Sequence, residues 1–230
     1  MIKQILLLFI VLLITLNSFS QIGTDTLSAN QIPETILYKG NFIKAIKWKD
    51  KLGENYLIIS ETDVIKSRIA KELIKTTEID YISKKGDTLY NDIRTELKDK
   101  EIWGVNYVIQ NDSIIKLWEI YDFIKECYGS LKLDFVEPPI VTDIDNNGIF
   151  QTWLIYKMNC SSDVSPSKMK ILMHIGNEKY AIRGTTQVSL NNKIDIEEYK
   201  MKFDSNFKKT SKSIIDFAND LWSKHVVENY

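Results

Sequence analysis

Apolar and polar residues alternate with a period of two over much of the chain from residue 35 onward. This alternation is typical of β-strands, whose successive side chains point to opposite faces of a sheet. Turn-forming residues separate the alternating segments, at Lys39-Gly40, Asp50-Lys51-Leu52-Gly53, Gln110-Asn111-Asp112 and Gly176-Asn177-Glu178. The pattern predicts sequential antiparallel hairpins.

One predicted strand differs from the others because residues 149–158 are largely apolar or aromatic on both alternating faces. A strand of this kind is usually covered on both sides, so we predict that it lies centrally in its sheet. In the strand that follows, Lys170, Leu172 and His174 share one face. We expect His174 to be a surface residue of that strand.

An apolar stripe with the helical period lies near the C-terminus, at Ile214, Ala218, Leu221 and Trp222. Ser211 or Ser213 is a suitable N-cap for such a helix. We therefore predict a C-terminal amphipathic helix that packs on the sheet. Together with the hairpins, this helix indicates an α+β, β-rich fold.

Residues 64–101 are rich in charges of both signs. Ile65, Ile69 and Leu73 recur at helical spacing, and Thr62 or Asp63 can cap a short helix before them. We predict a charged, partly helical insertion within a single domain that covers residues 21–230.

Residues 1–20 have the features of a cleavable secretory signal. The basic residue Lys3 precedes an apolar run at residues 5–16, and small residues follow at Ser18 and Ser20. The run is shorter than the roughly 20 residues that a membrane-spanning helix needs. We predict export to the periplasm or the cell surface, with no transmembrane segment in the mature chain.

Charge and cysteine content refine this picture. The chain carries 30 Lys and Arg residues against 31 Asp and Glu residues, a net charge of −1, and the two signs are interspersed. We therefore predict no nucleic-acid partner. Cys127 and Cys160 are predicted to form a disulfide, the alternative being two buried free thiols. The loop of roughly 34 residues would contribute about 3–4 kcal/mol in the chain-entropy model.

The most informative local motif begins at Asp143. Oxygen-bearing side chains alternate along it, and Gly148 permits a sharp turn, as in a calcium-binding loop. The candidate calcium ligands are Asp143, Asp145, Asn147, the carbonyl group of Ile149, and Gln151. Leu154 stands where the glutamate of an EF-hand would be. Calcium is the candidate cofactor, and a tight hairpin turn is the alternative interpretation of the same residues.

The sequence contains no catalytic motif of high specificity. Four carboxylates that cluster in the sequence are candidates for the paired acids of a glycoside hydrolase: Glu137, Asp143, Asp145 and Asp163. Ser165 with His174 as its base would lack the Gly-x-Ser-x-Gly turn that activates a serine, and a polar loop is the simpler interpretation.

A further segment, Arg183-Gly184-Thr185-Thr186, follows a predicted strand. The segment is a candidate for holding an anionic group, and it equally fits the end of a strand in which Gly184 relaxes the backbone.

Three segments together resemble an exported bacterial family: Asp143-Ile144-Asp145-Asn146-Asn147-Gly148, Cys160-Ser161-Ser162-Asp163-Val164-Ser165-Pro166, and Lys179-Tyr180-Ala181-Ile182-Arg183-Gly184-Thr185-Thr186. The family carries the label "surface polysaccharide biosynthesis protein". The resemblance covers most of the mature chain and excludes residues 65–100. In that family the calcium-like turn often ends in an acidic residue, where this chain has Gln151.

The label implies an association with envelope polysaccharide and assigns no catalytic residue. With the predicted export and β-rich fold, it leads us to expect a non-catalytic accessory or binding factor in surface polysaccharide biology. The expected partners are envelope polysaccharide or envelope proteins. Two alternatives are an envelope glycan hydrolase that uses the acidic cluster and a structural component of the envelope.

Overall fold

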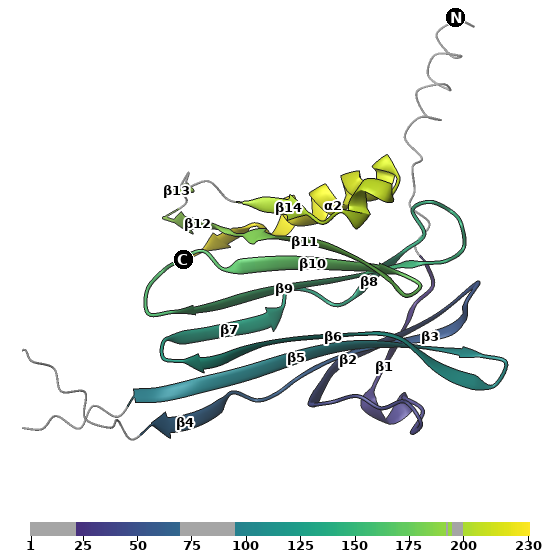
Figure 1. Ribbon diagram of the computed structural model, residues 1–230, viewed down its shortest axis with the longest axis horizontal. Coiled ribbons are helices and arrows are strands. Elements are labelled where there is room, and N and C mark those ends of the chain that lie inside the picture. The colour runs from purple at the N-terminus through teal and green to yellow at the C-terminus, as the bar shows by residue number, and fades with distance from the viewer. Residues whose placement is uncertain (1–21, 70–94, 192, 195–199) are drawn as a thin grey trace, which may run out of the picture.

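The computed structural model describes residues 22–69, 95–191, 193–194 and 200–230, and antiparallel β-sheets dominate it (Figure 1). The predicted signal peptide lies outside the described residues, as do residues 70–94 of the predicted insertion. The β-rich fold with one C-terminal helix agrees with the sequence-based prediction.

The first sheet, which we call sheet A, is centred on its longest strand, β5. Along one side β5 pairs with β3 and β4, and along the other it pairs with β6. The six strands are β1 (Asp25–Leu27), β2 (Asn41–Asp50), β3 (Gly53–Glu61), β4 (Ile65–Ile69), β5 (Thr95–Gln110) and β6 (Ser113–Cys127).

The second sheet, sheet B, has six strands: β7 (Ser130–Phe135), β8 (Ile140–Thr142), β9 (Gln151–Ser161), β10 (Lys168–Ile175), β11 (Glu178–Thr185) and β14 (Met201–Phe203). Strand β9 is central, as predicted, and residues 151–157 of it are all buried. A small third sheet contains β12 (Gln187–Leu190), β13 (Lys193–Ile194) and β15 (Val227–Asn229).

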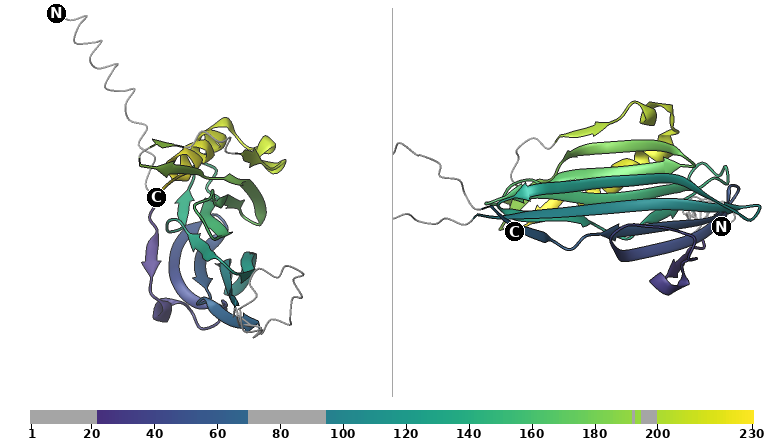
Figure 2. Two further views of the ribbon diagram at one scale, coloured as in Figure 1. Left: turned by 90° about the vertical axis from the view of Figure 1, so that its left-hand side faces the viewer. Right: turned by 60° about the horizontal axis from the view of Figure 1, so that its bottom comes forward.

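Helix α2 (Lys212–His225) covers one face of sheet B, and sheet A covers much of the other (Figure 2). The hydroxyl group of Ser211 caps the helix by accepting a hydrogen bond from the Ile214 amide. The predicted stripe is buried, at Ile214, Ala218, Leu221 and Trp222. Two single-turn 3-10 helices, η1 (Ala29–Gln31) and η2 (Asn206–Lys209), complete the described elements.

Alternate residues of sheet B therefore belong to two different cores. Trp153, Ile171 and Ile182 pack against the helix. Leu154, Leu172 and Ala181, their neighbours along the chain, pack against sheet A. The period-two pattern thus produces three layers in which one sheet is shared between two hydrophobic cores.

Turn chemistry fixes the hairpins at the predicted places. Asn111 and Asp112 join β5 to β6 with φ angles of 48° and 58°, which these two residue types tolerate better than most. Two positive φ angles in a two-residue loop match the right-handed twist of the flanking strands. The long β5–β6 hairpin therefore has a local cause in the sequence.

The predicted disulfide between Cys127 and Cys160 is present, with 5.7 Å between the Cα atoms. Cys127 ends β6 of sheet A, and Cys160 lies near the end of β9 in sheet B. The bond therefore joins the two sheets covalently at one end of the sandwich.

One predicted element is wrong. Residues Ile65 and Ile69 lie in strand β4 instead of a helix, and Leu73 lies outside the described residues. β4 pairs in register with the first part of β5, from Ile65 opposite Asp99 to Ile69 opposite Thr95. Pairing with β5 gives this segment backbone hydrogen bonds along its length. The weak helical preference indicated by two isoleucines at helical spacing is too small to compete with them.

Candidate functional site

The Asp143 loop is closed by hydrogen bonds among its own residues. The carboxylate of Asp145 accepts one hydrogen bond from the side-chain amide of Gln151 and one from the side-chain amide of Asn147, both at 2.7 Å. The Oδ1 atom of Asn147 accepts from the amide of Ile149 at 2.7 Å. The carboxylate of Asp143 accepts from the amide of Gly148 at 3.2 Å. The candidate calcium-ligand side chains are thus brought together, with their oxygens already accepting protein donors.

Gln151 is the centre of this network and is fully buried. Its Oε1 atom accepts from the amide of Ile144 at 2.8 Å and from the hydroxyl of Thr142 at 3.0 Å. Calcium would therefore have to replace internal hydrogen bonds of a buried amide. This geometry supports the turn interpretation, and calcium binding stays a prediction.

The β2–β3 turn packs directly on this loop. The Lys51 ammonium donates to the carbonyl of Asn147, and the Lys51 amide donates to the carbonyl of Gly148 at 2.8 Å. Asp50 accepts from the amide of Phe150 at 3.3 Å. The two Asp/Gly-rich turns therefore interlock, and a positive charge already lies beside the candidate calcium loop.

The structure separates Asp163 from the Asp143 loop, which contains both Asp143 and Asp145. Asp145 contacts the first residue of β9, whereas Asp163 accepts from the Ser161 hydroxyl at the last residue of that strand. Eleven strand residues separate these ends, which corresponds to roughly 30 Å. Paired acids in glycosidases lie about 5–10 Å apart, so these two carboxylates do not form such a pair.

Glu137 also has structural partners. Its carboxylate contacts Lys224 at 2.8 Å and His225 at 2.9 Å, both near the end of helix α2. Ser165 lies in the loop before β10, and its carbonyl accepts from the Asn159 side chain at 3.1 Å. His174 lies near the other end of β10, so the structure does not bring the candidate serine and base together.

The surface position expected for His174 is wrong, because only 2% of this residue is exposed. Its ring stacks on the indole of Trp118 at 4.0 Å between centroids, since sheet A covers this part of sheet B. Burial, and then the positive charge of Lys179, lowers the pKa of His174 to about 3. The imidazole is therefore neutral at physiological pH.

His174 borders a cavity of about 10 Å³ that is also lined by Asn106 and Thr152. Each of these residues contributes a buried polar atom without a hydrogen-bond partner among the described residues. The volume is about that of one water molecule. The cavity is therefore too small for a sugar.

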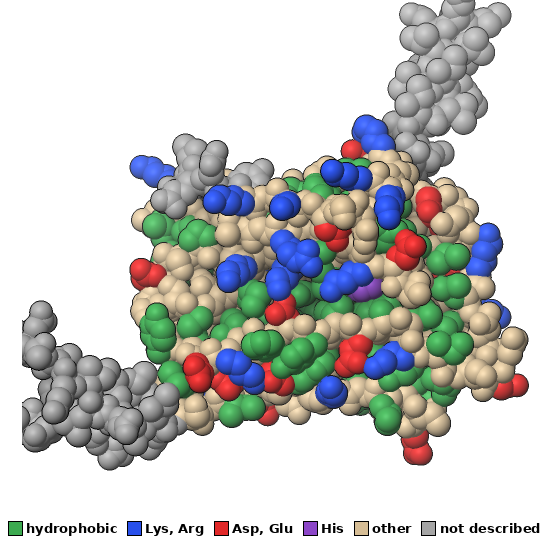
Figure 3. All heavy atoms as spheres, viewed as in Figure 1, with side chains coloured by type: hydrophobic (Ala, Val, Ile, Leu, Met, Phe, Trp, Pro, Cys, Tyr) green, Lys and Arg blue, Asp and Glu red, His purple; other side chains and the backbone are tan. Residues whose placement is uncertain are grey.

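The uncovered part of sheet B carries a row of cations, which we call the cationic strip: Lys168, Lys170, Lys179, Arg183 and Lys202. Register explains the row, because Lys170 lies opposite Arg183 and Arg183 lies opposite Lys202 on adjacent strands. Lysine and arginine side chains gather over β9, β10 and β11 in Figure 3. Like charges directly opposite each other destabilise a sheet, so the strip costs stability.

The strip ends at a contact with sheet A. Lys170 forms an ion pair with Asp122 of β6, and Asp122 also accepts from the Tyr156 hydroxyl at 2.7 Å. Although desolvation opposes it, the hydrogen bonds from Lys170 and Tyr156 lower the pKa of Asp122. The Lys170 ammonium also lies 5.7 Å from the centre of the Tyr156 ring.

The remaining strip cations lack such partners. Within the described ranges, Lys179, Arg183 and Lys202 have no carboxylate within ion-pair distance. Partial desolvation, followed by the charges of Arg183 and Lys170, lowers the pKa of Lys179. Asp204, the acid nearest in register to this end of the strip, instead accepts backbone hydrogen bonds from Ala181 and Asn206. The strip is therefore a surface of excess positive charge.

No known family model, curated protein or solved structure matches the chain. Membership of the polysaccharide-associated family therefore stays a prediction. Among the residues with described positions, no helix is long and apolar enough to cross a membrane.

The sequence contained a weak signal for the strip. Arg183 was a candidate anion-binding residue, and Lys170 was placed on the face of β10 that the strip occupies. Lys168 and Lys170 share a face two residues apart, as do Lys179 and Arg183 four residues apart. Their convergence depends on the register between strands, which the sequence alone does not show.

Proposed function

We propose that this chain is a non-catalytic binding factor of the cell envelope that recognises an acidic surface polysaccharide. The cationic strip is the observation that supports this proposal most strongly. Three of its residues, Lys170, Arg183 and Lys202, lie opposite one another on adjacent strands whose backbones are about 4.8 Å apart. A polymer with repeated negative charges can contact several of them at once, which multiplies the affinity of each weak contact.

The electrostatic repulsion within the cationic strip, which lowers the stability of the fold, supports the same proposal. Arg183 lies between two lysines across adjacent strands, an arrangement that repulsion disfavours. An anionic ligand would convert this repulsion into attraction and would be drawn to the surface from a distance. Because the sheet already holds the backbone of these residues, ligand binding has to order only their side chains.

The structural partners of the candidate acids support a non-catalytic function over hydrolysis. Asp145 and Asp163 lie at opposite ends of β9, and both accept hydrogen bonds within local turns. The strip itself offers cations and a tyrosine with a raised pKa, caused by desolvation and by the negative charge of Asp122. These groups suit charge recognition better than proton transfer at neutral pH.

The test is binding of residues 21–230 to polygalacturonate, a carboxylated polysaccharide, with neutral dextran as a negative control. We expect binding that weakens as salt rises, because salt screens exposed charges. The variant Arg183→Glu/Lys202→Glu should lose at least about tenfold in affinity, a change of roughly 1.4 kcal/mol.

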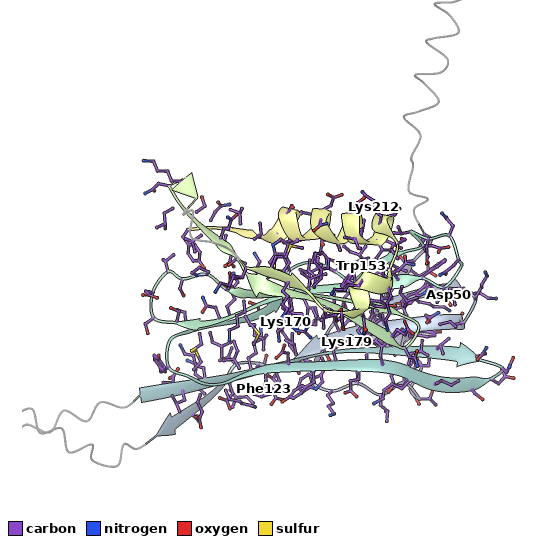
Figure 4. The ribbon with its side chains drawn as sticks, turned by 45° about the horizontal axis from the view of Figure 1, so that its top comes forward. Asp50, Phe123, Trp153, Lys170, Lys179 and Lys212 are labelled. Carbon is purple, nitrogen blue, oxygen red and sulfur yellow. A yellow bond between two sulfur atoms is a disulfide. The ribbon has the colours of Figure 1, made fainter. Side chains whose placement is uncertain are left out.

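A matched control is Lys39→Glu/Lys212→Glu, which changes the net charge equally. Lys39 lies before β2, and Lys212 begins helix α2, away from Lys170 and Lys179 (Figure 4). This control should retain wild-type affinity. Equal losses in both double variants, or no binding by the wild-type chain to any acidic polysaccharide, would contradict the proposal and favour a structural function in the envelope.

A further inference from the structure

A second surface feature lies beside the cationic strip, on the other side of β6. The rings of Trp103 and Tyr121 stack with centroids 5.6 Å apart and an angle of 24° between their planes. Tyr121 stacks in turn with Phe123 at 5.5 Å and 30°. These side chains form a continuous aromatic row across β5 and β6.

The row is anchored at one end and open at the other. Trp103 is only 6% exposed, whereas Tyr121 is 50% exposed and Phe123 is 46% exposed. The buried indole holds the phenol ring in place, and the phenol ring supports Phe123. Pairing across strands accounts for the contact between Trp103 and Tyr121, which face each other in register. It does not account for a phenylalanine left half-exposed at the end of the row.

Charged groups surround the two open rings. The Tyr121 hydroxyl donates to Glu101 at 3.0 Å, and Lys125 forms an ion pair with the same carboxylate. Next to Phe123 in the chain, Asp122 pairs with Lys170 of the cationic strip. Figure 4 shows Phe123 on the strand that borders Lys170 and Lys179. Because successive residues of a strand point to opposite faces, the aromatic row and the cationic strip lie on the two sides of β6, an edge strand that the Asp122–Lys170 ion pair joins to the strip.

We infer that Tyr121 and Phe123 form a stacking subsite for a sugar ring of the acidic polysaccharide that the cationic strip binds. This inference rests on the proposed function. Stacking on the two rings would let the protein distinguish a sugar polymer from other anionic polymers. The apolar area is about two rings wide and is bordered by Glu101 and Lys125. A sugar matches this pattern, because its C–H face packs on an aromatic ring while its hydroxyl groups reach the charged border.

Other occupants fit this surface less well. A stable protein interface buries about 1,200–2,000 Å² around an apolar centre that is depleted of charge. Here charged groups begin at the edge of two rings. A single-stranded nucleic acid would also stack on aromatic rings, but proteins that bind it carry a clear excess of basic residues, whereas this chain has a net charge of −1.

The experiment measures affinity for oligogalacturonate and for polyglutamate, an anionic polymer without sugars. Phe123→Ala should weaken oligogalacturonate binding about tenfold, by analogy with the stacking of bases on aromatic side chains, and leave polyglutamate binding unchanged. Phe123→Trp should restore the saccharide affinity. The matched control is Ile115→Ala, since Ile115 is a half-exposed apolar residue of the same strand at 44% exposure. It should leave both affinities unchanged.

Several results would overturn the inference. Equal losses for oligogalacturonate and polyglutamate would show that Phe123 supports the sheet rather than a sugar. No loss for either would show that the ring takes no part in binding. Tighter binding of oligothymidylate with the same dependence on Phe123 would replace sugar by nucleic acid. If Arg183→Glu/Lys202→Glu loses saccharide binding while Phe123→Ala keeps it, the proposed function stands and the stacking subsite fails. Failure of wild-type binding would overturn both.

Discussion

The two faces of sheet B are made from alternate residues of the same strands. Charged groups are paired on the face toward helix α2 and largely unpaired on the opposite face. On the face toward helix α2, Lys132 and Lys157 of sheet B meet the buried carboxylate of Glu228, which belongs to β15 of the third sheet and accepts hydrogen bonds from the hydroxyl of Thr186 at 2.6 Å and from the backbone amide of Ser167 at 3.3 Å. It also pairs with Lys132 and, at 3.6 Å, with Lys157. On the opposite face, Lys179, Arg183 and Lys202 have no such partner among the described residues.

The difference separates groups that hold the fold together from groups that are available to a ligand. A buried charge is tolerated only when partners satisfy it, and Glu228 meets that condition. An exposed cation costs little when unpaired, but several side by side repel one another. The face toward the helix is therefore expected to determine stability, and the cationic strip to determine binding.

Removing Trp222 should produce the largest effect on stability with none on binding. This helix residue is 1% exposed and packs against sheet B. Trp222→Ala should lower the free energy of unfolding by about 3–5 kcal/mol. Denaturant unfolding measures the loss, and polygalacturonate binding at a temperature where the variant is folded should match wild type. A loss below about 1 kcal/mol would show that the helix face does not determine stability.

Acidification should remove the contribution of Glu228 to the stability of the fold. Despite desolvation, hydrogen bonds from Lys132, Thr186 and Ser167 lower the pKa of this carboxyl from 4.5 to about 2. A lowered folded-state pKa stabilises the fold above about pH 4.5, and this stabilisation is lost as the pH falls toward 2. The shift corresponds to roughly 3 kcal/mol.

The measurement is the free energy of unfolding between pH 6 and pH 2 for wild type and Glu228→Gln. The variant should be less stable at pH 6 and should lose less stability on acidification. Parallel pH profiles for the two proteins would show that other carboxylates produce the acid sensitivity.

The smallest effect is expected from calcium. The Asp143 loop resembles the Glu228 cluster in having its oxygens already hydrogen-bonded, and Lys51 adds a nearby positive charge. Millimolar calcium should therefore change the melting temperature by less than about 1 °C relative to chelator. A rise of several degrees that Asp145→Ala abolishes would establish the calcium site instead.

Local signals were sufficient to predict much of the fold. The hairpin turn at Asn111 and Asp112, the cap at Ser211 and the pair Cys127–Cys160 each depend on a few residues or on simple compartment chemistry. The strand β4 and the burial of His174 were predicted wrongly, because both depend on partners distant in the sequence.

The candidate site was harder to predict for the same reason. The Asp143 motif is contiguous and was found, but its hydrogen bonds and the approach of Lys51 involve a second turn. Arg183 was recognised as a candidate anion-binding residue by itself. Its alignment with Lys170 and Lys202 required the register of three strands.

The central claim is that the cationic strip is the binding surface, and its most direct test is a map of amide resonance shifts. Isotope-labelled residues 21–230 would be titrated with oligogalacturonate at low and high salt. The account predicts shifts concentrated on β10, β11 and β14 around Lys170, Arg183 and Lys202, reduced by salt. Shifts centred on helix α2 or on the Asp143 loop, or shifts that salt does not weaken, would contradict it.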